Sequence, residues 1–293
     1  MSTESKRSLV PIFWIGGLVI ALVAGGLLVA RWAVPLTRDL PSVVPSAHCY
    51  ATVNSTTASL NLEQARNASI IAGVAAERGL IARAVSIGLA TAFQESDIRN
   101  LEHGDLDSLG IFQQRPSQGW GTVEEILDPY YATRKFFDTM VEMVHNWQTA
   151  DIGDVAQTVQ RSGYPDAYDQ HVDRARILAS ALSGETPATW SCIVSNPASA
   201  DPDGLKAHLN RAYGAQITIE TPESGSASQL IVTARSEAVA WSVAAFAQSW
   251  ATEMGVSKVS VGNHHWQASA SVLAGWVANA DNPQDATTTI ITF

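Results

Sequence analysis

The order of hydrophobic and polar positions divides the chain into three parts, of which the first is the simplest. From Leu9 to Ala30, 22 consecutive residues carry no charge. About 20 apolar residues in a helix span a bilayer core of roughly 30 Å, so the run predicts a single transmembrane helix over residues 9–31. A cleaved signal peptide fits less well, because its apolar region would be about 7–15 residues long. Residues 1–8 then form a short tail.

The second part has the spacing of helices. Residues 32–48 contain three prolines and no helical period, which indicates an extended linker. Asn61 and Gln64 match a capping box at the start of the first helix. Residues 49–192 are therefore expected to form a mostly α domain with an irregular stretch at 98–126. Its five expected helices cover residues 61–78, 81–97, 128–147, a segment from 151, and 167–183.

The third part contains both the hydrophobic spacing of helices and the alternation of strands. Residues 193–202 hold two prolines among small polar residues and are interpreted as a linker. Residues 203–293 predict a small α+β domain of unknown role, in which Gly262-Asn263 can turn a hairpin. Its expected helices lie at 203–213 and 236–254, and its expected strands at 216–220, 229–234, 258–261, 264–269 and 287–293.

Composition and charge narrow the classes of protein. The chain has 46% hydrophobic residues, 18 basic and 28 acidic residues, and a net charge of -10. So apolar a chain is not disordered. A nucleic-acid partner is excluded, because nothing in the sequence provides the basic stripe that neutralises phosphates.

The two cysteines indicate the compartment. Cys49 and Cys192 lie beyond the apolar run and bracket the predicted α domain. Such a pair suggests a disulfide formed in an oxidising compartment, although two unrelated buried thiols remain an alternative. A disulfide would place the N-terminus in the cytoplasm and the main body on the extracytoplasmic side of the cell membrane.

Several common kinds of site are missing from the sequence. It has no phosphate-loop signature, no nucleophile elbow, no Cys-x-x-Cys and no His-Glu-x-x-His. His264 and His265 are adjacent in a predicted strand and so point to opposite faces. We therefore expect no metal site and no cofactor.

One carboxyl group stands out at the end of the second predicted helix, which is apolar nearly all round. Glu95 follows Phe93 at the helix C-terminus, where the helix dipole and the loss of water both disfavour its ionised form. A raised carboxyl pKa is what a general acid for glycoside cleavage needs. An inert, solvated glutamate is the alternative.

The segment after Glu95 has the composition of a carbohydrate groove. Its glycines, amides and tryptophan suit a sugar, since amides hydrogen-bond hydroxyl and N-acetyl groups and an indole stacks on a pyranose. For Gln113 and Trp120 the alternatives are bracing of the loop and core packing. The candidate substrate-binding residues here are Ser96, Gly110, Phe112, Gln113, Gln114 and Trp120.

These residues resemble a known family. Glu95-Ser96, then Gly110-Ile111-Phe112-Gln113 fifteen positions on, then Pro116, is similar to the lytic transglycosylase pattern of Glu-Ser, Gly-Leu-Met-Gln and a proline. The resemblance covers roughly residues 60–185 and extends to membrane-anchored actinobacterial cell-wall proteins with this domain. It implies a lysozyme-like fold. The family's later Tyr-Asn-Ala-Gly stretch is not kept, because residues 159–164 read Val-Gln-Arg-Ser-Gly-Tyr.

The resemblance implies an enzyme that cleaves peptidoglycan glycan strands between N-acetylmuramic acid and N-acetylglucosamine, with Glu95 as general acid/base. In a transglycosylase Glu95 suffices, whereas a lysozyme-type glycosidase uses a second carboxylate, for which Asp105 and Asp107 are candidates. Turn formation is the other interpretation of these two aspartates. Tyr164 and Tyr168 are further candidates to line the groove.

Two other functions stay open. The chain could be a non-catalytic peptidoglycan-binding or scaffold subunit of a cell-envelope assembly. It could also dock an envelope protein through residues 203–293, with tryptophans as the contact residues, although core packing is the other role for these rings. The tryptophans concerned are Trp241, Trp250, Trp266 and Trp276.

Overall fold

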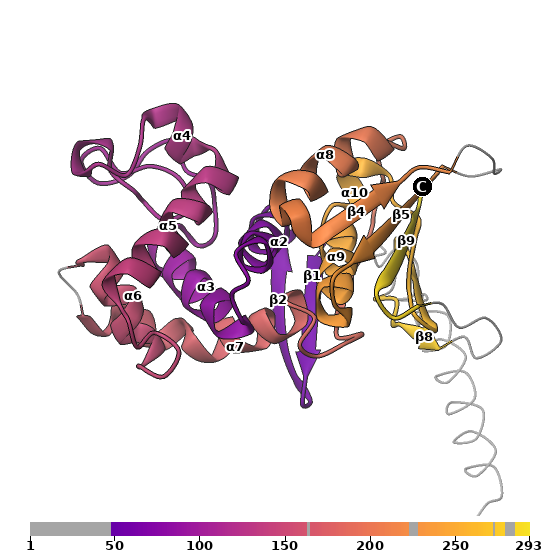
Figure 1. Ribbon diagram of the computed structural model, residues 1–293, viewed down its shortest axis with the longest axis horizontal. Helices are drawn as coiled ribbons and strands as arrows, with labels where there is room; N and C mark the ends of the chain where they lie inside the picture. The colour runs from indigo at the N-terminus through magenta and orange to yellow at the C-terminus, as the bar shows by residue number, and fades with distance from the viewer. Residues whose placement is uncertain (1–47, 163–164, 223–227, 272, 279–284) are drawn as a thin grey trace, which may run out of the picture. The chain divides into compact units, whose positions relative to one another are not determined.

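The computed structural model describes residues 48–162, 165–222, 228–271, 273–278 and 285–293. The predicted cytoplasmic tail, the predicted transmembrane helix, nearly all of the predicted linker after it and Tyr164 lie outside these residues. All described residues belong to one compact unit (Figure 1). Within them, no helix combines the length and the apolar character needed to cross a bilayer.

The described residues form a mixed α+β structure with nine α-helices and nine strands. The helices are α2 (Leu62–Glu77), α3 (Ala82–Ser96), α4 (Val123–Leu127), α5 (Pro129–Met143), α6 (Ile152–Gln160), α7 (Asp169–Leu182), α8 (Pro202–Tyr213), α9 (Glu237–Ser249) and α10 (Ala251–Met254). The strands are β1 (His48–Val53), β2 (Thr56–Asn61), β3 (Trp190–Cys192), β4 (Ile217–Glu220), β5 (Gln229–Ala234), β6 (Lys258–Val261), β7 (His264–Gln267), β8 (Val277–Ala278) and β9 (Thr288–Thr292).

The helix starts follow the predicted caps. Asn61 and Gln64 form the expected capping box at α2, with hydrogen bonds of 2.9 and 3.1 Å. Asp128 caps α5, and Pro129 occupies its first position. The stretch 98–126 was expected to be irregular, but it also contains a short 3-10 helix and α4, which has its own capping box at Thr122.

A small sheet that the sequence analysis did not predict opens the described chain. Strands β1, β2 and β3 form an antiparallel sheet in the order β2-β1-β3. Asn54 and Ser55 join β1 to β2 as a two-residue turn, both with positive φ, as a type I′ hairpin requires. Cys49 lies directly opposite Cys192 in this sheet, and the two are bonded. The predicted disulfide is therefore confirmed.

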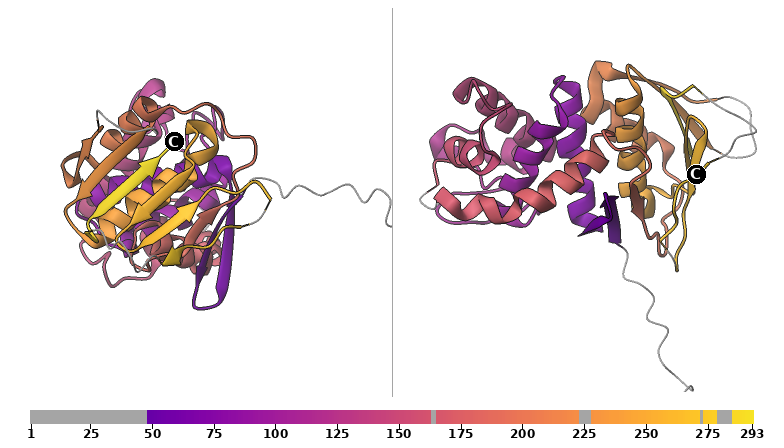
Figure 2. Two further views of the ribbon diagram at one scale, coloured as in Figure 1. Left: turned by 90° about the vertical axis from the view of Figure 1, so that its right-hand side faces the viewer. Right: turned by 90° about the horizontal axis from the view of Figure 1, so that it is seen from below.

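The C-terminal part is built on a second antiparallel sheet, with strand order β4-β5-β9-β6-β7-β8. Helices α8 and α9 pack on one of its faces (Figure 2). The predicted hairpin at Gly262-Asn263 joins β6 to β7. The single helix expected at 236–254 is split at Trp250 into α9 and α10.

Helix α2 links the helical part to the C-terminal part, because it packs against α8 and α9 as well as α3 and α5. The segment 193–202 was predicted as a linker. Its backbone forms hydrogen bonds to the backbone of the C-terminal part, for example from Ala198 N to Thr252 O at 2.8 Å. Gly184, expected to end a helix, has φ +73°, and a side chain there would collide with the carbonyl oxygen of Ala238 on α9. The two predicted domains therefore share a tightly packed boundary.

The tryptophans of the C-terminal part are internal. Trp266 is fully buried, and Trp241 and Trp250 are nearly so. Trp276 packs at 4.8 Å from Trp241 and donates to the carbonyl of Trp190 on β3 at 2.9 Å. Core packing, the other role considered for these rings, therefore describes Trp241, Trp250 and Trp266, whereas Trp276 is half-buried. Docking of an envelope protein through residues 203–293 stays a prediction.

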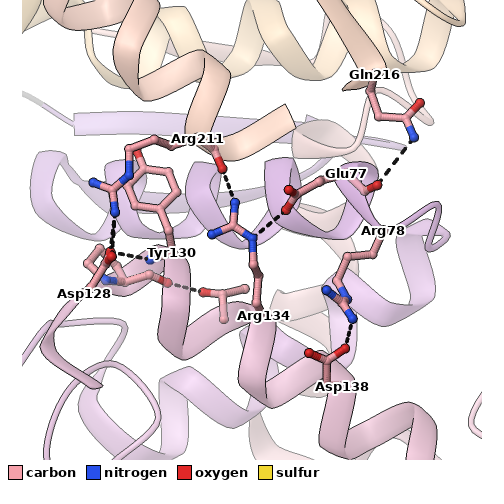
Figure 3. Close-up of polar contacts among 10 residues, drawn as sticks. Glu77, Arg78, Asp128, Tyr130, Arg134, Asp138, Arg211 and Gln216 are labelled. Atoms are coloured by element: carbon pink, nitrogen blue, oxygen red, sulfur yellow. Dashed lines mark hydrogen bonds and ion pairs between the residues drawn. The ribbon is translucent and has the colours of Figure 1, made fainter. Parts of the chain in front are cut away.

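A polar network joins α2 and α5 to α8 (Figure 3). Arg134 on α5 donates to Glu77 at 2.7 Å and to the carbonyl oxygen of Arg211. Arg211 donates to both carboxylate oxygens of Asp128, at 2.6 and 2.7 Å, and its guanidinium lies 4.0 Å from the ring centroid of Tyr130. The first turn of α5 is thereby tied to the end of α8.

Replacing Arg134 with Met is expected to lower the free energy of unfolding by about 1–2 kcal/mol, because the half-buried carboxylate of Glu77 and the carbonyl of Arg211 both lose their charged donor. Urea denaturation measures the change. Arg176→Met is the matched control, since its partner Asp173 is almost fully exposed and such pairs contribute little. Equal effects of the two substitutions would contradict a special role for Arg134.

Candidate functional site

A cleft of about 670 Å³ lies where the end of α3, the 105–120 segment, α5 and the end of α6 meet. Its size falls in the range of ligand pockets. It holds five of the residues singled out from the sequence. These are Glu95, Asp105, Gln113, Gln114 and Trp120.

Glu95 lies half-buried in the last turn of α3. The hydroxyl of Tyr168 donates to its Oε1 at 2.6 Å, and the side chain of Gln160 also hydrogen-bonds it. Burial raises the pKa of Glu95 above its ordinary value of 4.5, and the two hydrogen bonds offset only part of that shift. The carboxyl therefore keeps its proton to a higher pH than a solvated glutamate does.

The backbone after Glu95 is held in an uncommon conformation. Asp97 and Ile98 both have positive φ, 54° and 57°, which is rare for a β-branched residue. Two amides of α2 fix this turn, since Gln64 donates to the carbonyl of Asp97 at 2.9 Å and Asn67 to that of Ile98 at 2.8 Å. Local strain of this kind gathers at functional sites, and here it sets where α3 ends.

The loop at 109–114 is attached to both sides of Glu95. Ser96 donates to the carbonyl of Ile111 at 2.6 Å, and Gln160 donates to that of Phe112 at 2.8 Å. Gly110 turns the loop with φ +76°, and a Cβ there would lie 2.7 Å from the carbonyl oxygen of Ile126. The loop geometry therefore depends on the residues that flank the carboxyl.

Two amides and one indole of this region line the cleft. Gln113 donates to the carbonyl of Gly110 at 3.2 Å, and Gln114 to that of Ala132 at 3.1 Å. Gln114 is 2% exposed, and its Oε1 has no hydrogen-bond partner among the described residues. Trp120 is half-buried against the core, so part of its ring is available to a ligand.

Four other predicted contact residues do not line the cleft. Ser96 and Gly110 shape the loop, and the fully buried Phe112 stacks on Phe136 at 4.5 Å. Tyr168 is also fully buried and contacts Glu95 instead. The prediction that these four residues contact the substrate is therefore corrected, because each of them makes contacts within the protein instead. Tyr164 lies outside the described residues.

The two candidate second carboxylates differ. Asp105 is exposed and lines the cleft. Asp107 does not line it but accepts from Arg115 at 2.7 Å and from the backbone of Ser117 at 2.8 Å. These bonds hold the pKa of Asp107 well below its ordinary value. Asp107 thus follows the turn interpretation and is corrected as a catalytic candidate.

The sequence analysis missed Gln160 as a contact of Glu95, and Lys135 and Arg161 as lining residues. Gln160 and Arg161 stand in the segment that departs from Tyr-Asn-Ala-Gly. The sequence did contain a signal for Gln160 and Arg161, because these two polar residues stand together at the end of the amphipathic helix α6. Lys135 gave none, since only the packing of α5 brings it to the cleft.

No group of three or more His, Cys, Asp and Glu side chains in the described ranges is arranged to hold a metal ion. The sequence matches no protein-family model, and a search of the curated proteins also finds no match.

Replacing Tyr168 with Phe is expected to move the alkaline limb of any activity at Glu95 to higher pH. The lost hydrogen bond stabilises the carboxylate, so its removal raises the pKa of Glu95 further and keeps more of it protonated at a given pH. The pH profile of kcat/KM measures the shift. Tyr213→Phe is the control, because this buried tyrosine bonds Ser242 instead, and a shift there too would contradict the assignment.

Proposed function

We propose that the protein cleaves the β-1,4 bond between N-acetylmuramic acid and N-acetylglucosamine in peptidoglycan, with Glu95 as general acid/base on a lysozyme-like framework. The observation that carries the proposal is a half-buried carboxyl of raised pKa, at a helix end, that lines a cleft of about 670 Å³. The amides of Gln113 and Gln114 and the ring of Trp120 beside it suit a sugar.

In the proposed reaction, protonated Glu95 gives its proton to the glycosidic oxygen as the bond to C1 breaks. The resulting carboxylate then takes the proton of the muramic C6 hydroxyl, whose oxygen bonds to C1 and closes a 1,6-anhydro ring. This route needs no second carboxylate, which agrees with the position of Asp107 outside the cleft lining, where it pairs with Arg115. Hydrolysis instead would require Asp105, the other carboxylate of the lining.

Mass spectrometry of the products released from sacculi tests the proposal. Anhydro-muropeptides, lighter by one water, and unchanged activity of Asp105→Asn would indicate the intramolecular route. Hydrated products that disappear in Asp105→Asn would indicate hydrolysis. Retention of the protein on sacculi without any product would favour the non-catalytic binding subunit.

We further propose that residues 9–31 anchor the protein in the cell membrane, with the N-terminus in the cytoplasm and the body at the cell wall. The disulfide between Cys49 and Cys192 supports this orientation, because such bonds persist in oxidising compartments.

A further inference from the structure

The cleft contains positive charge that the proposed acid/base chemistry does not use. Lys135 and Arg161 line it, and neither forms an ion pair with a carboxylate in the part of the chain that the structure describes. The third lining cation, Arg115, is neutralised by Asp107 at 2.7 Å. In a chain with a net charge of -10, acidic partners are plentiful, so the lack of one at both positions calls for a role.

The two cations belong to different walls of the cleft. Lys135, Thr139 and Met143 stand four residues apart and so share one face of α5, and all three line the cleft. Arg161 is the residue that ends α6, with φ 52°, directly after Gln160. Because Gln160 hydrogen-bonds Glu95, Arg161 belongs to the part of the cleft next to the proposed reaction centre.

The charge balance of the lining favours an anionic ligand. Its carboxyl groups are Glu95 and Asp105, and burial disfavours the ionised form of Glu95. Exposed Asp105 then stands alone against Lys135 and Arg161. A cleft whose charge opposes that of the whole chain concentrates ligands of the opposite sign.

The buried side of the lining adds a second requirement. Gln114 belongs to the lining, and its Oε1 atom is almost completely buried and accepts no hydrogen bond from any described group. A buried acceptor without a partner costs free energy, and an N–H donor from a ligand would relieve that cost. The lining therefore suits a molecule that carries both amide N–H groups and carboxylates.

We infer that Lys135 and Arg161 bind a carboxylate of the glycan strand, so that the cleft selects carboxylate-bearing strands over neutral N-acetylglucosamine polymers. The inference rests on the proposed function, since it concerns the ligand of the same cleft. Two sources share this chemistry, namely the lactyl carboxyl of muramic acid and the carboxylates of a peptide attached to it. Salt would weaken the ion pairs that Lys135 and Arg161 form with the ligand carboxylate, because both cations are partly exposed.

Calorimetric titration of the full chain carrying Glu95→Gln tests the inference without turnover. The three probes are a neutral N-acetylglucosamine oligomer, a strand of equal length with free muramic carboxyls, and the same strand with peptide stems. We expect about tenfold tighter binding of at least one carboxylate-bearing strand, and loss of that preference on adding Lys135→Gln and Arg161→Gln. The strand that shows the preference identifies the source of the carboxylate.

Two further variants control for charge and folding. Lys258→Gln, at an exposed position of β6, should leave the preference unchanged, and Lys135→Arg should retain it. Equal binding of neutral and anionic strands, or an unchanged preference in the folded double variant, would overturn the inference. If the wild-type chain releases no muropeptides but the preference is found, the proposed cleavage fails and the inference stands.

Discussion

Glu95→Gln is expected to reduce the release of muropeptides from sacculi by about 10²- to 10⁴-fold, the range by which a positioned general acid/base accelerates a reaction. Glutamine has the same shape and can still accept from Tyr168, but it cannot give a proton to the glycosidic oxygen. Sedimentation with sacculi should persist, since the cleft is otherwise unchanged. Soluble product, quantified by chromatography over time, measures the loss.

The stability of this variant serves as its control. Because burial raises the pKa of Glu95 in the folded state above 4.5, the neutral carboxyl stabilises the fold fully below about pH 4.5, and this contribution is lost as pH rises through the folded-state pKa. The amide that replaces the carboxyl cannot ionise, so the stability of the variant relative to the wild type should rise as pH increases from about 4.5 to the folded-state pKa of Glu95 and should then stay constant. Glu142→Gln, at an exposed position of α5, should change neither quantity. Wild-type product release by folded Glu95→Gln would contradict the assignment.

Removing the disulfide with Cys49→Ala and Cys192→Ala is expected to lower the free energy of unfolding by about 5 kcal/mol. The bond closes a loop with a sequence separation of 143 residues, and the loop-entropy estimate for such a length is of this order. The bond also joins β1 to β3 at a fully buried position, so the variant leaves a cavity between the strands. Guanidinium denaturation measures the change.

A reducing agent separates the two contributions to this loss. Reduced wild-type protein should approach the stability of the double variant, whereas the double variant should not respond to the reductant. A wild-type protein whose denaturation midpoint is the same with and without reductant would show that the cross-link contributes little.

The helical elements were predictable because their signals are local. The capping box at Asn61, the Asp128-Pro129 start of α5 and the buried pattern of α3 each depend on neighbouring residues, and the structure confirms all three. The short strands β1, β2 and β3 were missed, because a three-residue strand such as β3 is stabilised by partners far away in the chain.

The candidate site also contains residues that local sequence predicts and residues whose position depends on distant parts of the chain. Glu95, Gln113, Gln114 and Trp120 follow from one stretch of sequence and do line the cleft. Phe112 and Ser96 belong to that stretch as well, but the loop turns Phe112 inward, and Ser96 is buried at the end of α3, where it bonds the loop. Composition cannot show which side of a loop faces the solvent, since that depends on Gln160 and α5, which are distant in sequence.

The amino-acid sequence by itself therefore determined the starts of α2 and α5, the cysteine pair and the acidic residue at the end of α3, because capping, periodicity and loop position act over a few residues. Only the tertiary structure decided that burial raises the pKa of Glu95 while Tyr168 and Gln160 lower it, that Asp107 pairs with Arg115, and that Lys135 and Arg161 line the same cleft. The reason is physical. A pKa and a binding surface depend on which groups share a volume, and packing brings those groups together from separate parts of the chain.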